Sequence, residues 1–326
     1  MSPAVAARAT REPSFSVVIP AYNEAANLPV VLPEVIRVLR DLSSAVEVIV
    51  VDDGSRDGTE RAMRELCGAW PELVYLQLSR NFGKEAALTA GIDAARGELV
   101  LLMDADGQHP VAMIPAMVER WRAGADVVYA VRSTRNDQTL LHARLASLFY
   151  LLVNWRNRVA IPPGAGDFRL MDRRVVDALK ALPERNRFMK GLYAWVGFVS
   201  TTLEYDPLPR HQGKSRFGLR SALSLGLTGL VSFSPAPLRL FAYLGLAISS
   251  LSLAYGLWVV LQFVAWGNDV PGWPTIVAGI MFLSGIQLLS VGVLSEYVGR
   301  IYEEVKQRPV YLLRDRAGSG LPDEAP

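Results

Sequence analysis

The first half of the chain alternates short apolar runs with longer stretches in which apolar residues recur every three or four positions. The short runs have the length of buried strands, and the longer stretches have the period of amphipathic helices. Strands are expected at Phe15–Ile19, Val46–Val51, Leu73–Leu78, Leu99–Met103 and Val127–Val131. Helices are expected at about Glu24–Leu42, Asp57–Ala69, Lys84–Ala95 and Val111–Ala123. Strand and helix in alternation predict an α/β domain with a mostly parallel sheet covered on both faces.

Polar residues follow the end of every expected strand. These segments are Pro20–Glu24, Asp52–Ser55, Ser79–Lys84, Asp104–Asp106 and Arg132–Ser133. Each segment taken alone fits a plain loop. The carboxyl ends of parallel strands meet at one edge of a sheet, and ligands of such sheets bind outside that edge. The sequence therefore predicts a single site there.

The fourth apolar run stops at two carboxylates one residue apart, Asp104 and Asp106. Two oxygen ligands at a sheet edge suit Mg²⁺ or Mn²⁺, because such an ion keeps open positions for a diphosphate. The alternative is a surface turn, since Asp and Gly are common turn formers.

Several function classes are disfavoured. No Gly-x-Gly-x-x-Gly follows the first strand and no Gly-x-x-x-x-Gly-Lys-Ser/Thr occurs, which argues against a dinucleotide enzyme and a P-loop ATPase. The formal net charge of +2 is too small for a general nucleic-acid binder, so no nucleic-acid partner is expected. The one cysteine, Cys67, excludes an internal disulfide framework and fits a reducing compartment.

Two long stretches near the C-terminal end carry no charge. Leu240–Trp266 has 27 residues and Trp273–Ser295 has 23, and a helix of about 20 residues spans a bilayer core. The turn between them, 267–272, has no Lys or Arg, whereas basic residues flank the pair: Arg220, Arg239, Arg300, Lys306 and Arg308. The positive-inside rule predicts a membrane hairpin with both termini in the cytosol. The alternative is two buried helices of a soluble protein.

The resulting organisation has four parts. A disordered leader is expected at 1–13, a cytosolic domain at 14–235, two transmembrane helices within 236–298, and a cytosolic tail at 299–326. Two apolar stretches with basic ends, about 139–156 and 219–233, favour helices lying in the membrane interface over core helices. Arg308–Leu313 has a pattern that fits a strand added to the sheet of a neighbouring subunit.

Five motifs together carry a family resemblance. They are Ser16–Glu24, Val50–Thr59, Asn81–Lys84, Asp104–Pro110 and Gly166–Leu170. The set resembles the family 2 inverting glycosyltransferases, and more narrowly the polyprenyl-phosphate glycosyltransferases. That branch includes dolichol-phosphate mannose synthases and the bacterial enzymes that load glucose or modified arabinose onto undecaprenyl phosphate. The resemblance covers about residues 15–310 and implies a GT-A-type, Rossmann-like domain followed by a transmembrane hairpin.

The resemblance implies roles for individual residues. The nucleotide-sugar would be bound by Pro20, Tyr22, Glu24, Asp53, Lys84 and Asp104, and the metal, Mg²⁺ or Mn²⁺, by Asp104, Asp106 and Gln108. Asp167 stands where the family has its catalytic carboxylate, with Asp106 acting beside it through the metal. The acceptor phosphate would meet Arg132, Arg169, Lys214 and Arg216. His109 lies beside the metal ligands but is expected to be structural, since its oxygen-donor neighbours do not call for imidazole.

The implied reaction moves a sugar from a nucleotide-sugar to polyprenyl phosphate, at a bacterial cytoplasmic membrane. The resemblance favours UDP as the carrier, leaves GDP-mannose open, and suggests a homo-oligomer, a tetramer in the bacterial relatives. A phosphate monoester is largely dianionic at neutral pH because its second pKa is about 6. Asp167 is therefore expected to orient the acceptor or the sugar as much as to take a proton.

One alternative comes from the same superfamily, and a second comes from another class of protein. A processive polysaccharide synthase would carry Gln-x-x-Arg-Trp beyond the catalytic carboxylate, and this chain has none. A non-catalytic membrane module that senses nucleotide-sugars would not need Asp106, Gln108 and Asp167 together, and all three are present.

Overall fold

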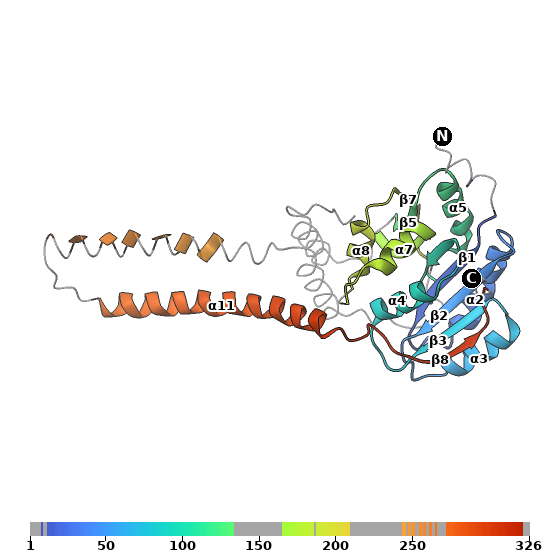
Figure 1. Ribbon diagram of the computed structural model, residues 1–326, viewed down its shortest axis with the longest axis horizontal. Coiled ribbons are helices and arrows are strands. Elements are labelled where there is room, and N and C mark those ends of the chain that lie inside the picture. Colours follow the sequence, from blue (N-terminus) through green and yellow to red (C-terminus); the bar gives the residue numbers. More distant parts are fainter. Residues whose placement is uncertain are drawn as a thin grey trace.

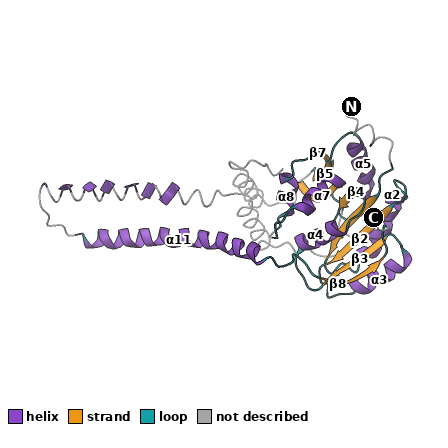
Figure 2. Ribbon diagram, viewed as in Figure 1, coloured by secondary structure: helices purple, strands orange, loops and turns teal. Residues whose placement is uncertain are grey.

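One mixed sheet forms the centre of the molecule. The computed structural model describes residues 8, 12–133, 165–185, 187–208 and 272–321, with part of 243–265. Eight strands pair in the order β7-β5-β6-β4-β1-β2-β3-β8 (Figures 1 and 2). They are β1 (Phe15–Ala21), β2 (Val46–Asp52), β3 (Leu73–Leu78), β4 (Leu99–Leu102), β5 (Val127–Arg132), β6 (Ala165–Asp172), β7 (Ser200–Tyr205) and β8 (Leu313–Gly318).

The five expected strands all form, within two residues of their predicted ends. β1 pairs in parallel with β2 on one side and with β4 on the other, and β3 pairs in parallel with β2. Every residue of β2, β3 and β4 is buried, which explains their near-continuous apolar sequence. The expected α/β sheet is therefore confirmed.

The strand β6 runs antiparallel between β4 and β5 and was not expected. Leu102 near the end of β4 lies opposite Arg169, and Val131 near the end of β5 lies opposite Ala165. Because β6 runs in the reverse direction, its first residues lie at the edge where the parallel strands end. The topology thus brings Asp167 to the predicted site.

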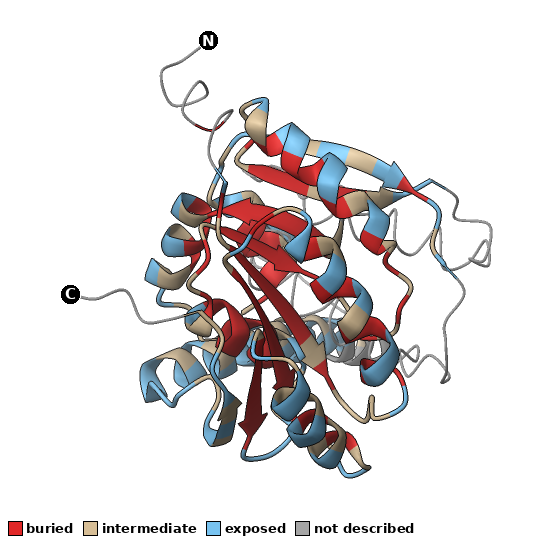
Figure 3. Cartoon of the chain, turned by 90° about the vertical axis from the view of Figure 1, so that its right-hand side faces the viewer, coloured by how far each residue is buried: buried red, intermediate tan, exposed pale blue. Residues whose placement is uncertain are grey.

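Helices cover both faces of the sheet. The helices α2 (Leu28–Arg40), α3 (Thr59–Ala69) and α5 (Ile114–Arg122) contribute to one apolar cluster, and a 3-10 turn, η1 (Val111–Met113), precedes α5. The helices α4 (Lys84–Ala94), α7 (Arg173–Ala181) and α8 (Met189–Trp195) contribute to the cluster on the other face. Figure 3 shows the buried sheet between partly exposed helices.

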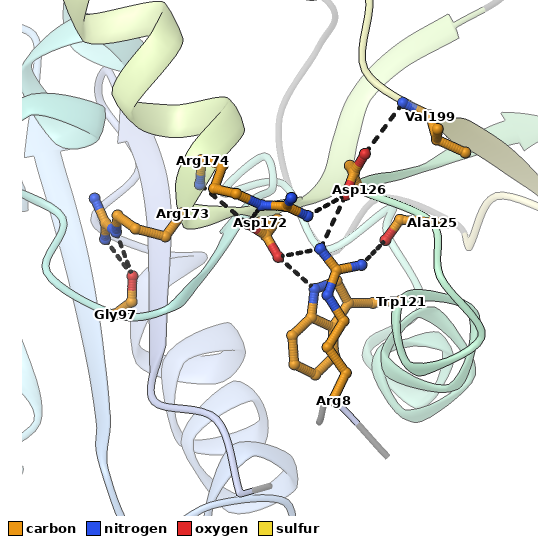
Figure 4. A network of polar contacts seen from close by, with 9 residues as sticks. All are labelled: Arg8, Gly97, Trp121, Ala125, Asp126, Asp172, Arg173, Arg174 and Val199. Carbon is orange, nitrogen blue, oxygen red and sulfur yellow. Dashed lines mark hydrogen bonds and ion pairs between the residues drawn. The ribbon is translucent and has the colours of Figure 1, made fainter. Parts of the chain in front are cut away.

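Arg8, which lies within the segment expected to be a disordered leader, docks on the domain (Figure 4). Its guanidinium donates to Asp126 at 2.9 Å and to Asp172 at 2.7 Å, and lies 5.1 Å from the centre of the Trp121 ring. The Trp121 indole donates to the same Asp172 carboxylate. A cation held by two largely buried carboxylates and an aromatic face fixes this part of the leader.

One long apolar helix, α11 (Trp273–Lys306), projects from the domain (Figure 1). Among the described residues one segment, Phe282–Lys306, is long and apolar enough to cross a membrane. The helix continues eleven residues beyond the expected end at Ser295. The partner span, 240–266, is described only in part, and its described residues are helical. The hairpin therefore stays a prediction.

The C-terminal tail returns to the sheet of its own chain. β8 pairs antiparallel with β3, with Val74 opposite Gly318, and Arg64 on α3 forms an ion pair with Asp315. The strand lies later than the predicted Arg308–Leu313 and pairs within the chain, unlike the predicted pairing with a neighbour. The predicted interface helices at 139–156 and 219–233 lie outside the described residues.

Candidate active site

One lysine joins two carboxylates at the carboxyl edge of the sheet. The Nζ of Lys84 lies 2.6 Å from Oδ1 of Asp104 and 2.7 Å from Oδ2 of Asp167. Lys84 is the first residue of α4, Asp104 follows β4, and Asp167 lies near the start of β6. Three elements thus meet at one cation, as the sheet topology requires.

In this cluster the lysine and the carboxylates each stabilise the ionised form of the other. Burial opposes the charged form of Lys84, but Asp167 and Asp104 outweigh it and raise the pKa of Lys84. Burial likewise opposes the charged form of Asp167, but Lys84, Lys190 and Arg169 hold the pKa of Asp167 well below its usual range. Asp167 is therefore a carboxylate at neutral pH and a weak base.

Asp53 fixes the loop that leads to Lys84. Its two carboxylate oxygens accept the backbone N–H groups of Phe82 at 2.6 Å and Gly83 at 2.9 Å. Burial raises the pKa of Asp53, against the effect of these two bonds. Gly54 has φ +69°, and a Cβ there would lie 2.6 Å from the backbone of Arg80. The loops after β2 and β3 are locked together, while contact of Asp53 with a nucleoside stays a prediction.

The loop after β1 holds the other expected nucleotide residues. Tyr22 and Glu24 are half-buried there, and so is Pro20, which lies near the end of β1 itself. Asn23, with φ +57°, donates its backbone N–H to Ser55, and the backbone N–H of Arg56 donates to the Asn23 side chain. The loops after β1 and β2 are thereby joined beside the carboxylate cluster.

The loop after β4 is shaped by its own side chains. Asp106 accepts the backbone N–H of Gln108 at 3.1 Å, and Nδ1 of His109 accepts the backbone N–H of Asp104 at 3.1 Å. The imidazole is buried and stacks on Phe168 with ring centres 4.6 Å apart. Burial lowers the pKa of His109, against the charges of Asp104 and Asp106. These contacts agree with the structural role expected for His109.

The donor set of this loop fits a hard divalent cation. Asp104 and Asp106 offer carboxylate oxygens and Gln108 offers an amide oxygen, which are the ligand types that Mg²⁺ and Mn²⁺ take. The described residues contain no cluster of three or more His, Cys, Asp or Glu side chains that would close such a site with protein ligands alone.

The expected acceptor-binding cations differ in placement. Arg132, at the end of β5, is exposed and donates to the Tyr205 hydroxyl at 3.3 Å and to Gln108 at 3.4 Å. Arg169 is 3 % exposed and lies 3.6 Å from the centre of the Tyr193 ring. This contact links β6 to α8, and the binding of a phosphate by Arg169 stays a prediction. Lys214 and Arg216 lie outside the described residues.

Sequence reasoning missed Glu85 and Lys190. Glu85 accepts the backbone N–H of Met189 at 3.2 Å, and Lys190 is the next residue of α8. Burial and the charge of Asp167 raise the pKa of Glu85 to about 7. The available sequence signal was weak: Glu85 precedes the mostly small and apolar run Ala86–Ile92, and a carboxylate at the edge of a buried helix needs a polar partner.

Comparisons with known proteins place the chain among sugar-transferring enzymes. The family model "Glycosyl transferase family 2" matches residues 16–180, and the model "GtrB C-terminal hairpin" matches residues 236–301. An uncharacterized glycosyltransferase of Synechocystis is 46% identical over 93% of this chain and 96% of its own length. The SfII prophage-derived bactoprenol glucosyl transferase of Shigella flexneri is 43% identical over 92% of this chain and 97% of its own.

A solved structure shows a more distant likeness. The mannosyltransferase of Pyrobaculum calidifontis, in complex with GDP-Man and Mn²⁺, aligns over 92% of this chain and 89% of its own with a TM-score of 0.47 and 19% identity.

Proposed function

The chain belongs to glycosyl transferase family 2, and from that membership we propose that it transfers a sugar from a nucleotide-sugar, a UDP-sugar first, to polyprenyl phosphate. The acceptor follows from the bactoprenol glucosyl transferases, which match nearly the whole chain. Their names also make glucose the first sugar to test.

The geometric observation that carries the proposal is the contact of one lysine with two carboxylates. Asp104 belongs to the predicted donor loop, and Asp167 is the predicted catalytic carboxylate. Because Lys84 reaches both, the donor diphosphate and the reacting sugar can lie within one compact, charged space. A module that only bound nucleotides would have no need of Asp167 at that distance.

The proposed chemistry is a displacement at the anomeric carbon. An oxygen of the lipid phosphate forms a bond to that carbon, while the bond to the nucleoside diphosphate breaks and the diphosphate leaves with both bonding electrons. The phosphate attacks as a dianion, so no proton has to be removed from it. Asp167, whose pKa is held low, is suited to orienting the sugar and poorly suited to general-base catalysis.

A divalent cation held by Asp104, Asp106 and Gln108 would neutralise the negative charge that develops on the departing diphosphate. The chain supplies the rest of the positive charge. Lys84 faces the leaving group from α4, and Arg132 is exposed on the side of Gln108. Lys214 and Arg216 would join Arg132 around the acceptor phosphate, offsetting its repulsion by the carboxylates.

The membrane arrangement is part of the same proposal. The catalytic domain and both termini would lie in the cytosol of a bacterium, with the hairpin in the inner membrane and the interface helices at the headgroups. The long apolar helix, the hairpin-model match and the basic flanking residues support it. A homo-oligomer, with a tetramer the first state to test, is proposed from the resemblance alone.

A transfer assay tests the proposal. Full-length protein in detergent is mixed with undecaprenyl phosphate, Mg²⁺ or Mn²⁺, and a panel of radiolabelled UDP- and GDP-sugars. We expect one donor to move label into the organic phase, with loss of transfer in Asp106→Asn and with chelator. Asp41→Asn, which changes an exposed aspartate after α2, is the matched control. Label entering the organic phase from GDP-mannose alone would replace the UDP-sugar proposal, and no transfer from any donor would count against the acceptor.

A further inference from the structure

Among the described residues, the carboxylate of Glu304 makes a polar contact between the membrane helix and the catalytic domain. Glu304, in the last turn of α11, accepts the backbone N–H of Arg185 with both oxygens, at 3.0 and 3.2 Å. Glu304 is half-buried, whereas the residues beside it on the helix are exposed. Arg185 in turn donates its guanidinium to the backbone carbonyl of Arg308 at 2.6 Å. The end of the helix is thus fastened at two points to the segment between α7 and α8.

The described residues of this connecting segment, 182–185 and 187–188, are held to one another as well. The guanidinium of Arg187 donates to the backbone carbonyls of Glu184 at 3.1 Å and Leu182 at 2.9 Å. Phe188, the last residue of the segment, and Met189, which follows it, are 3 % and 0 % exposed. A short segment braced internally and anchored in the core transmits a displacement instead of absorbing it.

The far end of the segment is fastened to the active site. Met189, the first residue of α8, donates its backbone N–H to Glu85, which follows Lys84 on α4. Lys190 on α8 is one of the charges that act on Asp167. Two carboxylates therefore clamp the connection between α7 and α8: Glu304 of the membrane helix binds Arg185 within the segment, and Glu85 of α4 binds Met189 directly after it.

The length of α11 indicates where its last turns lie relative to the membrane. At 1.5 Å per residue the 34 residues of α11 extend about 50 Å, and a bilayer core is about 30 Å thick. The charged last turns therefore lie outside the hydrocarbon, where Glu304 meets the domain. An acceptor whose chain lies in the bilayer presents its phosphate at a fixed depth, so the site has to be held at a matching height.

We propose that Glu304 and Glu85 are positioning residues that clamp segment 182–188 and so couple the membrane helix α11 to α8 beside Asp167. The coupling holds the active site at the depth and geometry that a membrane-bound acceptor requires. This inference rests on the proposed function for its acceptor, and on the two carboxylate contacts for its mechanism.

Amide hydrogen exchange and kinetics on the full-length protein in detergent or nanodiscs test the clamp. Glu304→Ala is compared with Glu296→Ala, which removes a carboxylate paired with Arg300 on the same helix. We expect Glu304→Ala to speed exchange at least about threefold in peptides over 183–188 and also in α8. The control should leave both regions unchanged. Faster exchange at Arg185 without any change in α8 would mean a local contact only and would overturn the coupling.

The kinetic readout separates positioning from folding. Glu304→Ala should lower kcat/KM for undecaprenyl phosphate about fivefold to tenfold, with the Kd for the nucleoside diphosphate within about twofold of wild type. Glu304→Gln keeps one acceptor oxygen for Arg185 and should restore at least about half of the lost activity. Should the alanine variant lose nucleotide binding through misfolding, Arg185→Ala decides the question, because it removes the second attachment of the helix end, the bond to the Arg308 carbonyl: wild-type exchange in α8 together with a wild-type rate would overturn the clamp.

Different experimental results would contradict the proposed function and the clamp. A wild-type protein that transfers no sugar would contradict the proposed function, while the exchange pattern would still report whether α11 and α8 are coupled. A wild-type protein that transfers sugar, with Glu304→Ala equal to Glu296→Ala in both readouts, would overturn the clamp and leave the proposed function standing.

Discussion

Lys84 connects three structural features of the site. It follows the loop that Asp53 fixes, it begins α4, and its ammonium group faces both Asp104 and Asp167. The motif predicted Lys84 as a donor-binding residue, because a lysine after Asn-x-Gly fits that family pattern. Its bond to Asp167 was not predictable, since it depends on the reversed direction of β6.

Replacing Lys84 by methionine should remove the positive charge and leave the chain length nearly unchanged. Asp104 and Asp167 would then face the donor diphosphate without compensation, and we expect the transfer rate to fall at least about 100-fold. Lys84→Arg keeps the charge in a different geometry and should retain more activity than the methionine variant. Initial rates of label transfer measure both, and a methionine variant as active as wild type would contradict the role of Lys84.

Glu85 should make stability depend on pH near neutrality. Burial and the charge of Asp167 raise its pKa to about 7 from a usual value of 4.5, while Met189, Lys84 and Lys190 act in the opposite direction. Arg169 and Tyr193 also face this carboxyl group. A raised folded-state pKa contributes stability that is full below pH 4.5 and is lost as the pH rises through 7.

Glu85→Gln stays neutral and should therefore gain stability relative to wild type as the pH rises from 5 to 8. The gain should be at most about 3 kcal/mol, because each pKa unit corresponds to about 1.4 kcal/mol and the side chain keeps some solvent contact. Thermal unfolding of the detergent-solubilised protein at the two pH values measures the difference. If the stability of the two proteins changed equally with pH, the Glu85 carboxyl group would have its usual pKa.

At the scale of the elements, the sequence predicts best the strands that are buried on both faces. β2, β3 and β4 are mostly apolar, so their positions follow from composition. β6 contains Asp167, Arg169 and Asp172, whose charges find partners only in the folded molecule, and β7 and β8 lie at the sheet edges with exposed residues. Charged strands carry no apolar signal, which is why these three were missed.

The Arg8 contact joins the N-terminal segment to α5 and β6. Burial opposes the charged form of Asp172, but Trp121, Arg174 and Arg8 outweigh it and lower the pKa of Asp172. Arg8→Ala should cost about 2 kcal/mol, less than a lone buried pair because Arg174 still contacts both aspartates. Arg61→Ala, at an exposed position of α3, is the control, and equal thermal midpoints for the two variants would contradict the contact.

At the scale of the whole molecule, the chain leaves the membrane helix and returns to the sheet. After α11 the chain passes the 182–188 segment and adds β8 to β3, so the helix is followed by two separate attachments to the domain. The sequence predicted the apolar helix from its uncharged run. The attachments rest on single polar contacts far apart in sequence, and such contacts leave no periodic signal.

The central claim is that the cluster around Asp167 transfers a sugar to polyprenyl phosphate. The most direct test compares wild type and Asp167→Asn in the transfer rate to undecaprenyl phosphate from pH 5 to 9, with nucleotide affinity measured in parallel. The account predicts a rate at least about 100-fold lower, a Kd for the nucleotide within about threefold of wild type, and a residual pH profile of unchanged shape. A variant that transfers sugar at the wild-type rate would contradict the account.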